Sequence, residues 1–428
     1  MARRRHPHSI EHNILITATL CLLAAGAVMV FSASSARTLL SGQGDGTSFM
    51  IKYVGYGAVG FVLMQIVARR GLEIVPRVTG PLLAASFVAL VAVKVPGLGV
   101  SVNGARRWLG AGPVVFQPSE VMKLALVLYA AKLLAERPQV LRRPKTLAPL
   151  GMVAGSAVLL IASQPDLGTA LVICFTMAAM LVAAGMPVRW LASATGVGGF
   201  LVLLYAMSAS YRRDRLMTFL DPWAHAGNEG FQSVQGQIAI GSGGLFGRGL
   251  GQSQQKNLFL PEAHTDFILA IIGEELGVVG ICGVLFLYGL VAYAGLRVAR
   301  NARGTYAKLL AAGVTSLFLS QAMLNVFTVL GLAPLTGVPL PFISYGSTNL
   351  VVLLLGMGVL LNVAGGGNVK LRVVPGPSAR SRRTSADATA RQGDVRTSRR
   401  DGTNDRDRGR RDSGARRAGA GSRRRAAG

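Results

Sequence analysis

One aspartate stands at the border between a polar loop and a long apolar run, in the segment Leu260-Pro-Glu-Ala-His-Thr-Asp266-Phe. Thr265 suits an N-cap, so we expect Asp266 in the first turn of a helix, where the helix dipole favours an ionised carboxylate. A positioned, ionised carboxylate can take a proton from an attacking hydroxyl. The residues alone leave two interpretations open: a catalytic base, or a helix-start residue with no further role.

Four basic residues that precede this aspartate in the sequence could bind a phosphate group. Arg106 and Arg107 lie in the segment Asn103-Gly-Ala-Arg-Arg-Trp108, and guanidinium groups bind phosphate oxygens in a bidentate manner. The alternative for these two arginines is a salt bridge or stacking on the tryptophan. Arg248 lies in the glycine cluster 241–251 and Lys256 follows it. The chain has no Gly-Lys dipeptide, which excludes a Walker A loop.

Three further charged residues lie beside or inside apolar runs. Glu120 and Lys123 are three residues apart, so they can pair on one helix face, and pairing lowers the cost of burying each charge. The pair either holds a helix bundle together or helps to shape a site. Asp166, in the short turn Gln164-Pro-Asp166, could be a helix cap, a metal ligand or a site residue, with capping as the default.

The elements that must position these residues are predicted to be membrane helices. Apolar residues make up 51% of the chain and charged residues 15%, which is typical of a membrane protein. A helical span needs roughly 20 mostly apolar residues. We therefore predict an all-α polytopic membrane protein with about ten transmembrane helices. They lie near residues 13–35, 50–68, 77–95, 118–135, 147–163, 168–186, 188–208, 265–297, 307–331 and 342–364.

The distribution of positive charge predicts the orientation, because cytoplasmic loops carry an excess of Lys and Arg. With residues 1–12 inside, the inner short loops hold most of the basic residues and both termini are cytoplasmic. The inner group is Arg69, Arg70, Arg77, Arg137, Arg142, Arg143, Lys145, Arg189, Arg297, Arg300, Arg303 and Lys308. Residues 209–264 then form a large extracytoplasmic loop between helices 7 and 8. Its length and aromatic content predict a lid or platform packed on the bundle.

The last segment, 365–428, is predicted to be a disordered basic cytoplasmic tail. From Lys370 onward it holds 18 Lys and Arg against 6 Asp, so it contributes +12 of the net charge of +26. It has too few apolar residues to bury a core. We expect contact with anionic lipids or a division protein rather than with nucleic acid.

Eight segments together resemble the SEDS family of membrane proteins, in order and over roughly residues 13–365. They are NGARRW (103–108), QPSEVMK (117–123), QPDLGTA (164–170), FLDPW (219–223), IAIGSGGLFGRGLG (238–251), LPEAHTDF (260–267), GEELG (273–277) and LPFISYG (340–346). The segment around Lys256 is more similar to the division and sporulation branch, FtsW and SpoVE, than to RodA. Residues 338–341 lean toward RodA, and Gly346-Ser-Thr-Asn349 departs from the family's Gly-Gly-Ser-Ser.

The resemblance implies a peptidoglycan glycosyltransferase of the cytoplasmic membrane. It would polymerise lipid II, the undecaprenyl-pyrophosphate disaccharide-peptide, at the outer face during division or sporulation. A class B penicillin-binding protein transpeptidase and other division proteins would be its partners. The resemblance implies Asp266 as the essential aspartate and Glu120 and Lys123 as the family's ion pair. The negative charge of the leaving pyrophosphate could be neutralised by Arg106, Arg107, Lys256 or Arg248, together with a divalent cation, Mg²⁺ or Mn²⁺. Two alternatives stay open, a lipid II flippase and a non-catalytic scaffold of the division machinery.

Overall fold

The structure is a computed structural model. It describes residues 9–40, 47–102, 105–111, 114–137, 147–207, 213, 217–228, 230–256, 260, 263–367, 369 and 371. The predictions for residues 1–8 and for the tail beyond residue 371 therefore lie outside the described residues.

Each of the ten predicted spans contains one helix in the part of the chain that the structure describes. These helices are α1 (Ile10–Leu40), α2 (Thr47–Arg69), α3 (Ile74–Ala92), α4 (Pro118–Glu136), α5 (Ala148–Ala162), α6 (Leu167–Ala183), α7 (Val188–Met207), α10 (Ile268–Asn301), α11 (Thr305–Val329) and α12 (Ser347–Ala364). Six of them, α1–α3 and α10–α12, are long and apolar enough to cross a membrane. The chain is thus a multi-pass membrane protein.

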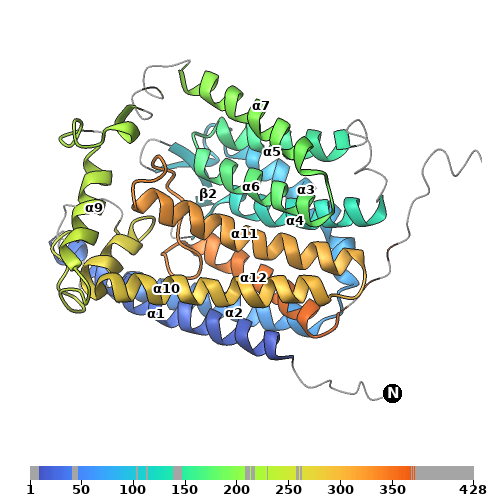
Figure 1. The fold of residues 1–428 in the computed structure, drawn as a ribbon, viewed down its shortest axis with the longest axis horizontal. Helices are drawn as coiled ribbons and strands as arrows, with labels where there is room; N and C mark the ends of the chain where they lie inside the picture. Colours follow the sequence, from blue (N-terminus) through green and yellow to red (C-terminus); the bar gives the residue numbers. More distant parts are fainter. Residues whose placement is uncertain are drawn as a thin grey trace, which may run out of the picture. The chain divides into compact units, whose positions relative to one another are not determined.

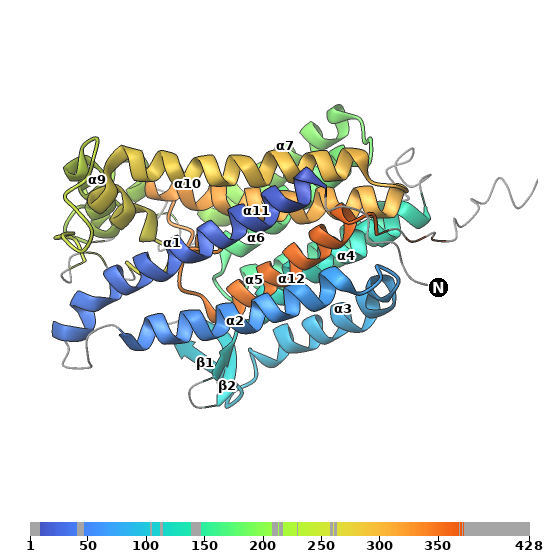
Figure 2. The same ribbon diagram turned by 90° about the horizontal axis from the view of Figure 1, so that it is seen from below.

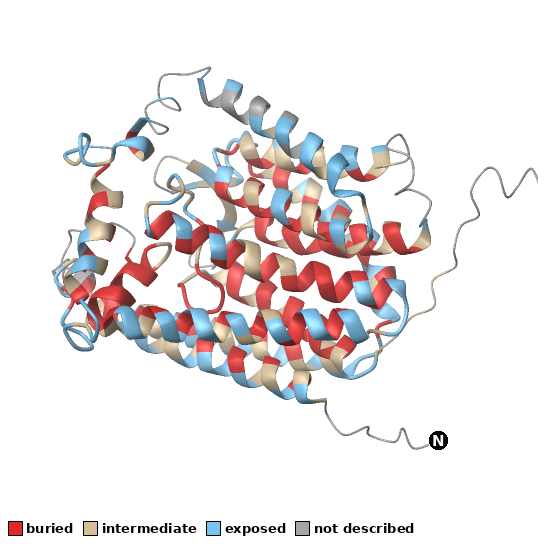
Figure 3. Cartoon of the chain, viewed as in Figure 1, coloured by how far each residue is buried: buried red, intermediate tan, exposed pale blue. Residues whose placement is uncertain are grey.

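Helix α11 lies at the centre of the bundle and packs against α4, α6, α10 and α12. Of its most apolar 18-residue window 78% is buried, against 22% for α2 and α3. Figure 3 shows the same contrast, with α11 largely red and the outer helices largely blue or tan. Large apolar side chains such as Val88 and Phe286 are exposed on the outer helices. Such side chains suit contact with lipid tails.

The bundle is closed by long-range helix pairs rather than by neighbours in sequence. Helix α12 packs along α2, and α1 packs along α10 (Figures 1 and 2). Close packing requires glycine at two of these contacts: a side chain at Gly60 would collide with Leu354, and one at Gly358 would collide with the backbone of Met64. Helices from opposite ends of the chain therefore lie side by side, α12 against α2 and α1 against α10.

Two structured segments lie outside the predicted helices. A three-stranded antiparallel sheet precedes α4, with strands β1 (Gly99–Val102), β2 (Ala105–Ala111) and β3 (Val114–Phe116) in the order β1-β2-β3. Val100 pairs with Trp108, and Leu109 pairs with Phe116. Inside the large loop, α9 (Phe231–Gly243) packs along α10 (Figure 1). This contact agrees with the expected packing of the loop on the bundle.

Helix α1 ends at Leu40 instead of 35, and the starts of the eighth and tenth predicted helices also differ from the expectation. Helix α10 begins at Ile268, so Asp266 lies in the turn before the helix and Thr265 is not its N-cap. The last helix begins at Ser347 instead of 342, and residues 331–346 form an irregular connection that we call the return loop. Helix α10 also bends at Gly277, where φ is 66° and ψ is −163°. Only glycine adopts that backbone conformation readily.

Candidate active site

Asp266 lies in a turn that is fastened to the central helix. The Thr265 hydroxyl donates a hydrogen bond to Asp266 Oδ1 at 3.0 Å. From α11, the Asn325 side-chain amide donates to the carbonyl oxygens of Asp266, at 2.7 Å, and of Val338, at 2.8 Å. Asp266 itself is only partly buried. Its backbone is therefore held by a buried residue, while Asp266 as a whole stays partly exposed.

The return loop is held by side chains from three helices. Besides the Asn325 bond to Val338, Gln321 Nε2 donates to the Pro339 carbonyl at 2.9 Å and the Tyr288 hydroxyl donates to the Pro341 carbonyl at 2.5 Å. The Tyr53 hydroxyl donates to the carbonyl of Phe342, a residue with a φ of 62°. Irregular backbone within a membrane bundle needs such partners, because lipid offers none.

The return loop passes directly beside the Asp266 carboxylate. A Cβ atom at Gly337, where φ is +66°, would lie 3.9 Å from Asp266 Oδ2. On its other side the loop touches the start of α6, where a side chain at Gly168 would collide with the carbonyl of Thr336. Residues 336–338 thus separate the start of α6 from Asp266 and form one wall of the space that the carboxylate faces.

Asp166 is buried and caps α6. Its Oδ1 accepts from the backbone NH of Thr169 at 3.2 Å. Its Oδ2 accepts from Gln117 Nε2 and from the Ser119 hydroxyl, both at 3.4 Å. These bonds join the starts of α4 and α6 and use both carboxylate oxygens. Capping, the default for Asp166 in the sequence, is what the geometry describes.

The two arginines of strand β2 have different surroundings. Arg106 is exposed and Arg107 is half-buried. Arg107 Nε donates to the Gln164 carbonyl at 3.2 Å, and its Nη2 donates to the Pro165 carbonyl. Arg107 therefore fastens the small sheet to the turn before α6. The Arg106 side chain is the more accessible of the two for an anionic ligand.

Glu120 and Lys123 form a buried ion pair, with Lys123 Nζ 2.8 Å from Glu120 Oε2. Lys123 Nζ also donates to Gln321 Oε1 at 2.8 Å. Gln321 Nε2 in turn donates to Asn349 Oδ1 at 3.0 Å, as well as to Pro339 in the return loop. The network joins α4, α11 and α12 and, through Gln321, holds the return loop beside Asp266.

Lys256 and Arg248 lie in a second cluster, at the bend of α10. Lys256 Nζ contacts Glu275 Oε1 at 3.1 Å and donates to the Gly251 carbonyl at 2.7 Å. Arg248 lies 3.7 Å from Glu274 Oε1 and also donates to the Ser242 carbonyl. The α10 carboxylates follow Asp266 by about two helical turns. Each of these cations already has an acidic partner, whose identity the sequence did not indicate.

The residues that hold the Asp266 turn were not among the candidates predicted from the sequence. Asn325 and Gln321 are four residues apart within an apolar helix, so they share one helix face. Amide side chains in such a helix usually bond to a neighbouring segment. That spacing was a usable signal. Tyr53 and Tyr288 carried no comparable signal, because tyrosines are common in membrane spans.

The described residues contain no group of three or more His, Cys, Asp and Glu that could hold a metal ion. This arrangement is compatible with Mg²⁺, which often binds through one or two carboxylates together with phosphate oxygens of a substrate. Asp266 is a partly exposed carboxylate that could serve in that way.

Comparisons with known proteins agree on one family. A family model for FtsW, RodA and SpoVE, described as "Cell cycle protein", matches residues 12–367. The chain is 39% identical to stage V sporulation protein E of Bacillus subtilis over 353 residues, which is 82% of this chain and 96% of that protein. It is 36% identical to a probable peptidoglycan glycosyltransferase FtsW of Geobacter sp. over 352 residues, 82% of this chain and 96% of that protein.

Two solved structures have a similar fold. One is a chain of a peptidoglycan synthase complex that coordinates polymerisation and crosslinking, with a TM-score of 0.70 and 28% identity over 83% of this chain and 98% of that chain. The other is the rod shape determining protein RodA of Thermus thermophilus, with a TM-score of 0.62 and 28% identity over 83% of this chain and 97% of that chain. The chain belongs to the FtsW/RodA/SpoVE family, which the SEDS motifs predicted.

Proposed function

We propose that this protein is a peptidoglycan glycosyltransferase that polymerises lipid II into glycan strands. The FtsW relatives carry this activity in their names, and the chain covers 96% of the Geobacter protein. The observation that carries the proposal is the position of Asp266. Its carboxylate is partly exposed, its backbone is bonded to the buried Asn325, and the return loop passes beside it. A general base needs this combination of access and fixed position.

In the proposed reaction Asp266 takes the proton from the acceptor's sugar hydroxyl. The hydroxyl oxygen forms a bond to the anomeric carbon of the donor sugar. The bond from that carbon to the lipid pyrophosphate breaks, and the pyrophosphate leaves with the electron pair. A single displacement converts the α-linked donor into a β-1,4 linkage. The hydrogen bond from Thr265 to Asp266 Oδ1 orients the carboxylate that accepts the proton.

The leaving pyrophosphate needs positive charge more than it needs a proton. Arg106 is the first choice among the four predicted cations, because it is exposed on β2. Arg107, Lys256 and Arg248 are secondary choices, because each is bonded to backbone carbonyls or carboxylates. Asp266 is the carboxylate that would hold a divalent cation, which would supply further charge neutralisation.

The topology and partners are part of the same proposal. Arg107 links the small sheet to the turn before α6, Gly168 packs that turn's helix against Thr336 of the return loop, and Gly236 packs α9 against Phe267. All of these segments belong to the predicted outer side. We place the site at the extracytoplasmic face with both termini inside. A class B penicillin-binding protein is the proposed partner, in line with the peptidoglycan synthase complex among the similar structures.

The test is a polymerisation assay in detergent with lipid II and the partner transpeptidase. Asp266→Asn should insert and fold normally but make no glycan polymer. Glu73→Gln, which changes an exposed carboxylate before α3, should retain full activity. Polymer formation by Asp266→Asn would remove the base assignment. Failure of the unaltered protein to polymerise would favour the flippase or the scaffold. Of these two, only the scaffold predicts that Asp266→Asn still supports division.

A further inference from the structure

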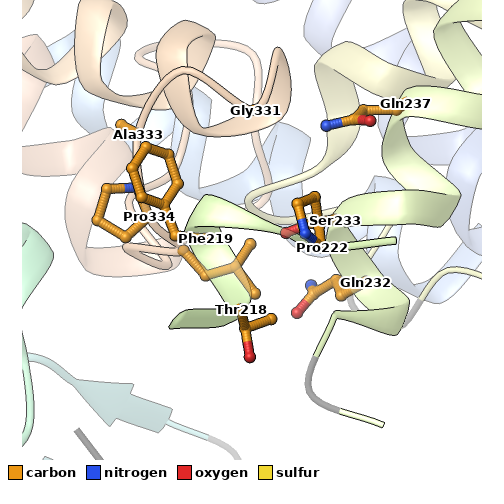
Figure 4. A pocket seen from close by; sticks show the side chains of 10 residues that line it. Thr218, Phe219, Pro222, Gln232, Ser233, Gln237, Gly331, Ala333 and Pro334 are labelled. Atoms are coloured by element: carbon orange, nitrogen blue, oxygen red, sulfur yellow. The ribbon is translucent and has the colours of Figure 1, made fainter. Parts of the chain in front are cut away.

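A pocket of about 260 Å³ lies between the large loop and the return loop. One wall consists of Gly331, Ala333, Pro334 and Leu335 from the return loop. Residues of α9, with Gln232, Ser233 and Gln237, form the opposite wall (Figure 4). None of the residues assigned so far to catalysis or charge neutralisation lines this pocket.

The pocket lining is uncharged and mixes polar groups with flat apolar ones. Ser233 and the two glutamines supply hydroxyl and amide groups, and Phe219 and two prolines supply apolar faces. This combination suits a sugar ring, which presents hydroxyl and amide groups at its edge and C–H bonds on its faces. The lining lacks the cations that a pyrophosphate needs. The volume is slightly below the range of about 300–1,000 Å³ typical of drug-sized ligands, so it fits one ring better than a whole lipid-linked disaccharide.

The polar groups that a ligand can reach lie on α9. Ser233 and Gln237 are partly exposed, and both are among the side chains that line the cavity (Figure 4). Thr218 also lines the pocket, but its hydroxyl oxygen is buried, so a ligand in the pocket does not contact it.

Residues in both walls of the pocket are close in sequence to positions that pack against residues 266 and 267. On one side, Leu335 precedes by two residues Gly337, whose Cβ position is 3.9 Å from Asp266 Oδ2. On the other side, Gly236 adjoins Gln237 and packs so closely on Phe267 that a side chain there would collide with the ring. Gly331, with a φ of +75°, makes room for the Gln237 amide between the walls. Each wall of the pocket thus lies within two residues of a position that packs against residue 266 or 267.

We propose that this pocket is a saccharide subsite, which holds one N-acetylated sugar ring of the glycan next to the ring that reacts at Asp266. The inference rests on the proposed function, because that function supplies the sugar. In this arrangement the large loop binds carbohydrate while the membrane helices bind the lipid. A sugar ring bound in this subsite would hold the end of the glycan in position after each addition.

The direct probe is binding of a soluble β-1,4-linked N-acetylated tetrasaccharide, obtained from uncrosslinked glycan, to the full chain carrying Asp266→Asn. Ser233→Ala in that background removes one hydroxyl from the pocket lining. We expect the dissociation constant to rise about 3- to 10-fold, as for the loss of one hydrogen bond, with no fall in thermal stability. A hydroxyl with a purely structural role would instead lower the stability and leave binding unchanged.

A second pair of variants tests the cavity itself. Ala333→Phe places a ring in the pocket, whereas Leu332→Phe changes the adjacent exposed residue, which does not line it. We expect Ala333→Phe to abolish tetrasaccharide binding and to shorten the polymer made with Asp266 intact, while Leu332→Phe does neither. The subsite is overturned if the Asp266→Asn chain shows no saturable binding, or if Ser233→Ala and Ala333→Phe in that background bind the tetrasaccharide as tightly as the Asp266→Asn chain does. These results leave the proposed function standing if the unaltered protein polymerises lipid II. Binding without polymerisation would support the subsite and refute the function.

Discussion

Replacement of Asn325 by leucine should disable the protein without unfolding it. The change removes both donors that hold the carbonyls of Asp266 and Val338, at 2.7 and 2.8 Å, and nearly conserves the size of the side chain. Asn325 is only 1% exposed, so water does not readily replace these donors. The Asp266 turn and the return loop lose their shared attachment to α11.

The magnitudes separate the effect on stability from the effect on rate. Side-chain hydrogen bonds between membrane helices contribute about 0.6 kcal/mol on average and about 1.7 at most, so two of them contribute about 1–3 kcal/mol. Folded proteins are stable by about 5–15 kcal/mol, and the variant should stay folded. Displacement of a catalytic group by about 1 Å can lower the rate about 100-fold, which corresponds to about 2.7 kcal/mol of activation free energy.

The assay is lipid II polymerisation at varied substrate concentration, with thermal unfolding measured on the same samples. We expect kcat to fall about 100-fold in Asn325→Leu, with a much smaller change in KM. Met323→Leu, on the exposed face of the same helix, is the matched control and should behave as the unaltered protein. A folded Asn325→Leu variant with kcat within twofold of the unaltered protein would refute the view that this amide positions Asp266.

Three further changes probe the surrounding elements. Lys256→Met leaves the fully buried Glu275 without its cation, so the free energy of unfolding should fall by about 3–5 kcal/mol. Adding Glu275→Gln should largely restore this stability. A Lys256→Met variant as stable as the unaltered protein would contradict this ion pair. Gly277→Ala should destabilise the bend of α10 by about 1–3 kcal/mol, whereas Gly283→Ala, with open space around it on the same helix, should not. Arg106→Ala should raise the KM for lipid II about 10-fold or more if this guanidinium binds pyrophosphate. Arg107→Ala should mainly lower stability, because the turn at Gln164 loses its hydrogen bond to Arg107. A raised KM for Arg107→Ala and a lowered stability for Arg106→Ala would exchange their roles.

The helices could be predicted from the sequence because membrane crossing imposes a length and a composition. All ten predicted spans contain a helix, and most boundaries agree within a few residues. The small sheet was missed because its strands have only 3–7 residues and lie between much longer apolar runs. Short strands that pair only with one another have a weak sequence signal.

The start of α10 was placed too early for a physical reason. Thr265 was expected to cap the helix, but its hydroxyl donates to the neighbouring Asp266 carboxylate instead. The partner that holds the turn, Asn325, lies 59 residues further along the chain. Likewise, the Glu275 side chain bonds to Ser32, 243 residues away, as well as to Lys256. Single-sequence patterns describe neighbours, so such partners could not be assigned in advance.

The same contacts explain why the candidate base can lie in a turn rather than in a helix. A loop exposed to lipid would leave its carbonyls without donors, which costs several kcal/mol for each group. Here the return loop receives donors from Asn325 and Gln321 on the central helix, α11, and from Tyr53 and Tyr288 on α2 and α10. The reacting carboxylate is thereby anchored in the rigid centre, while the saccharide pocket is built partly from the large loop. Changes at Asn325 should therefore act on kcat and changes at Ser233 on saccharide binding, and a double variant should show nearly additive effects.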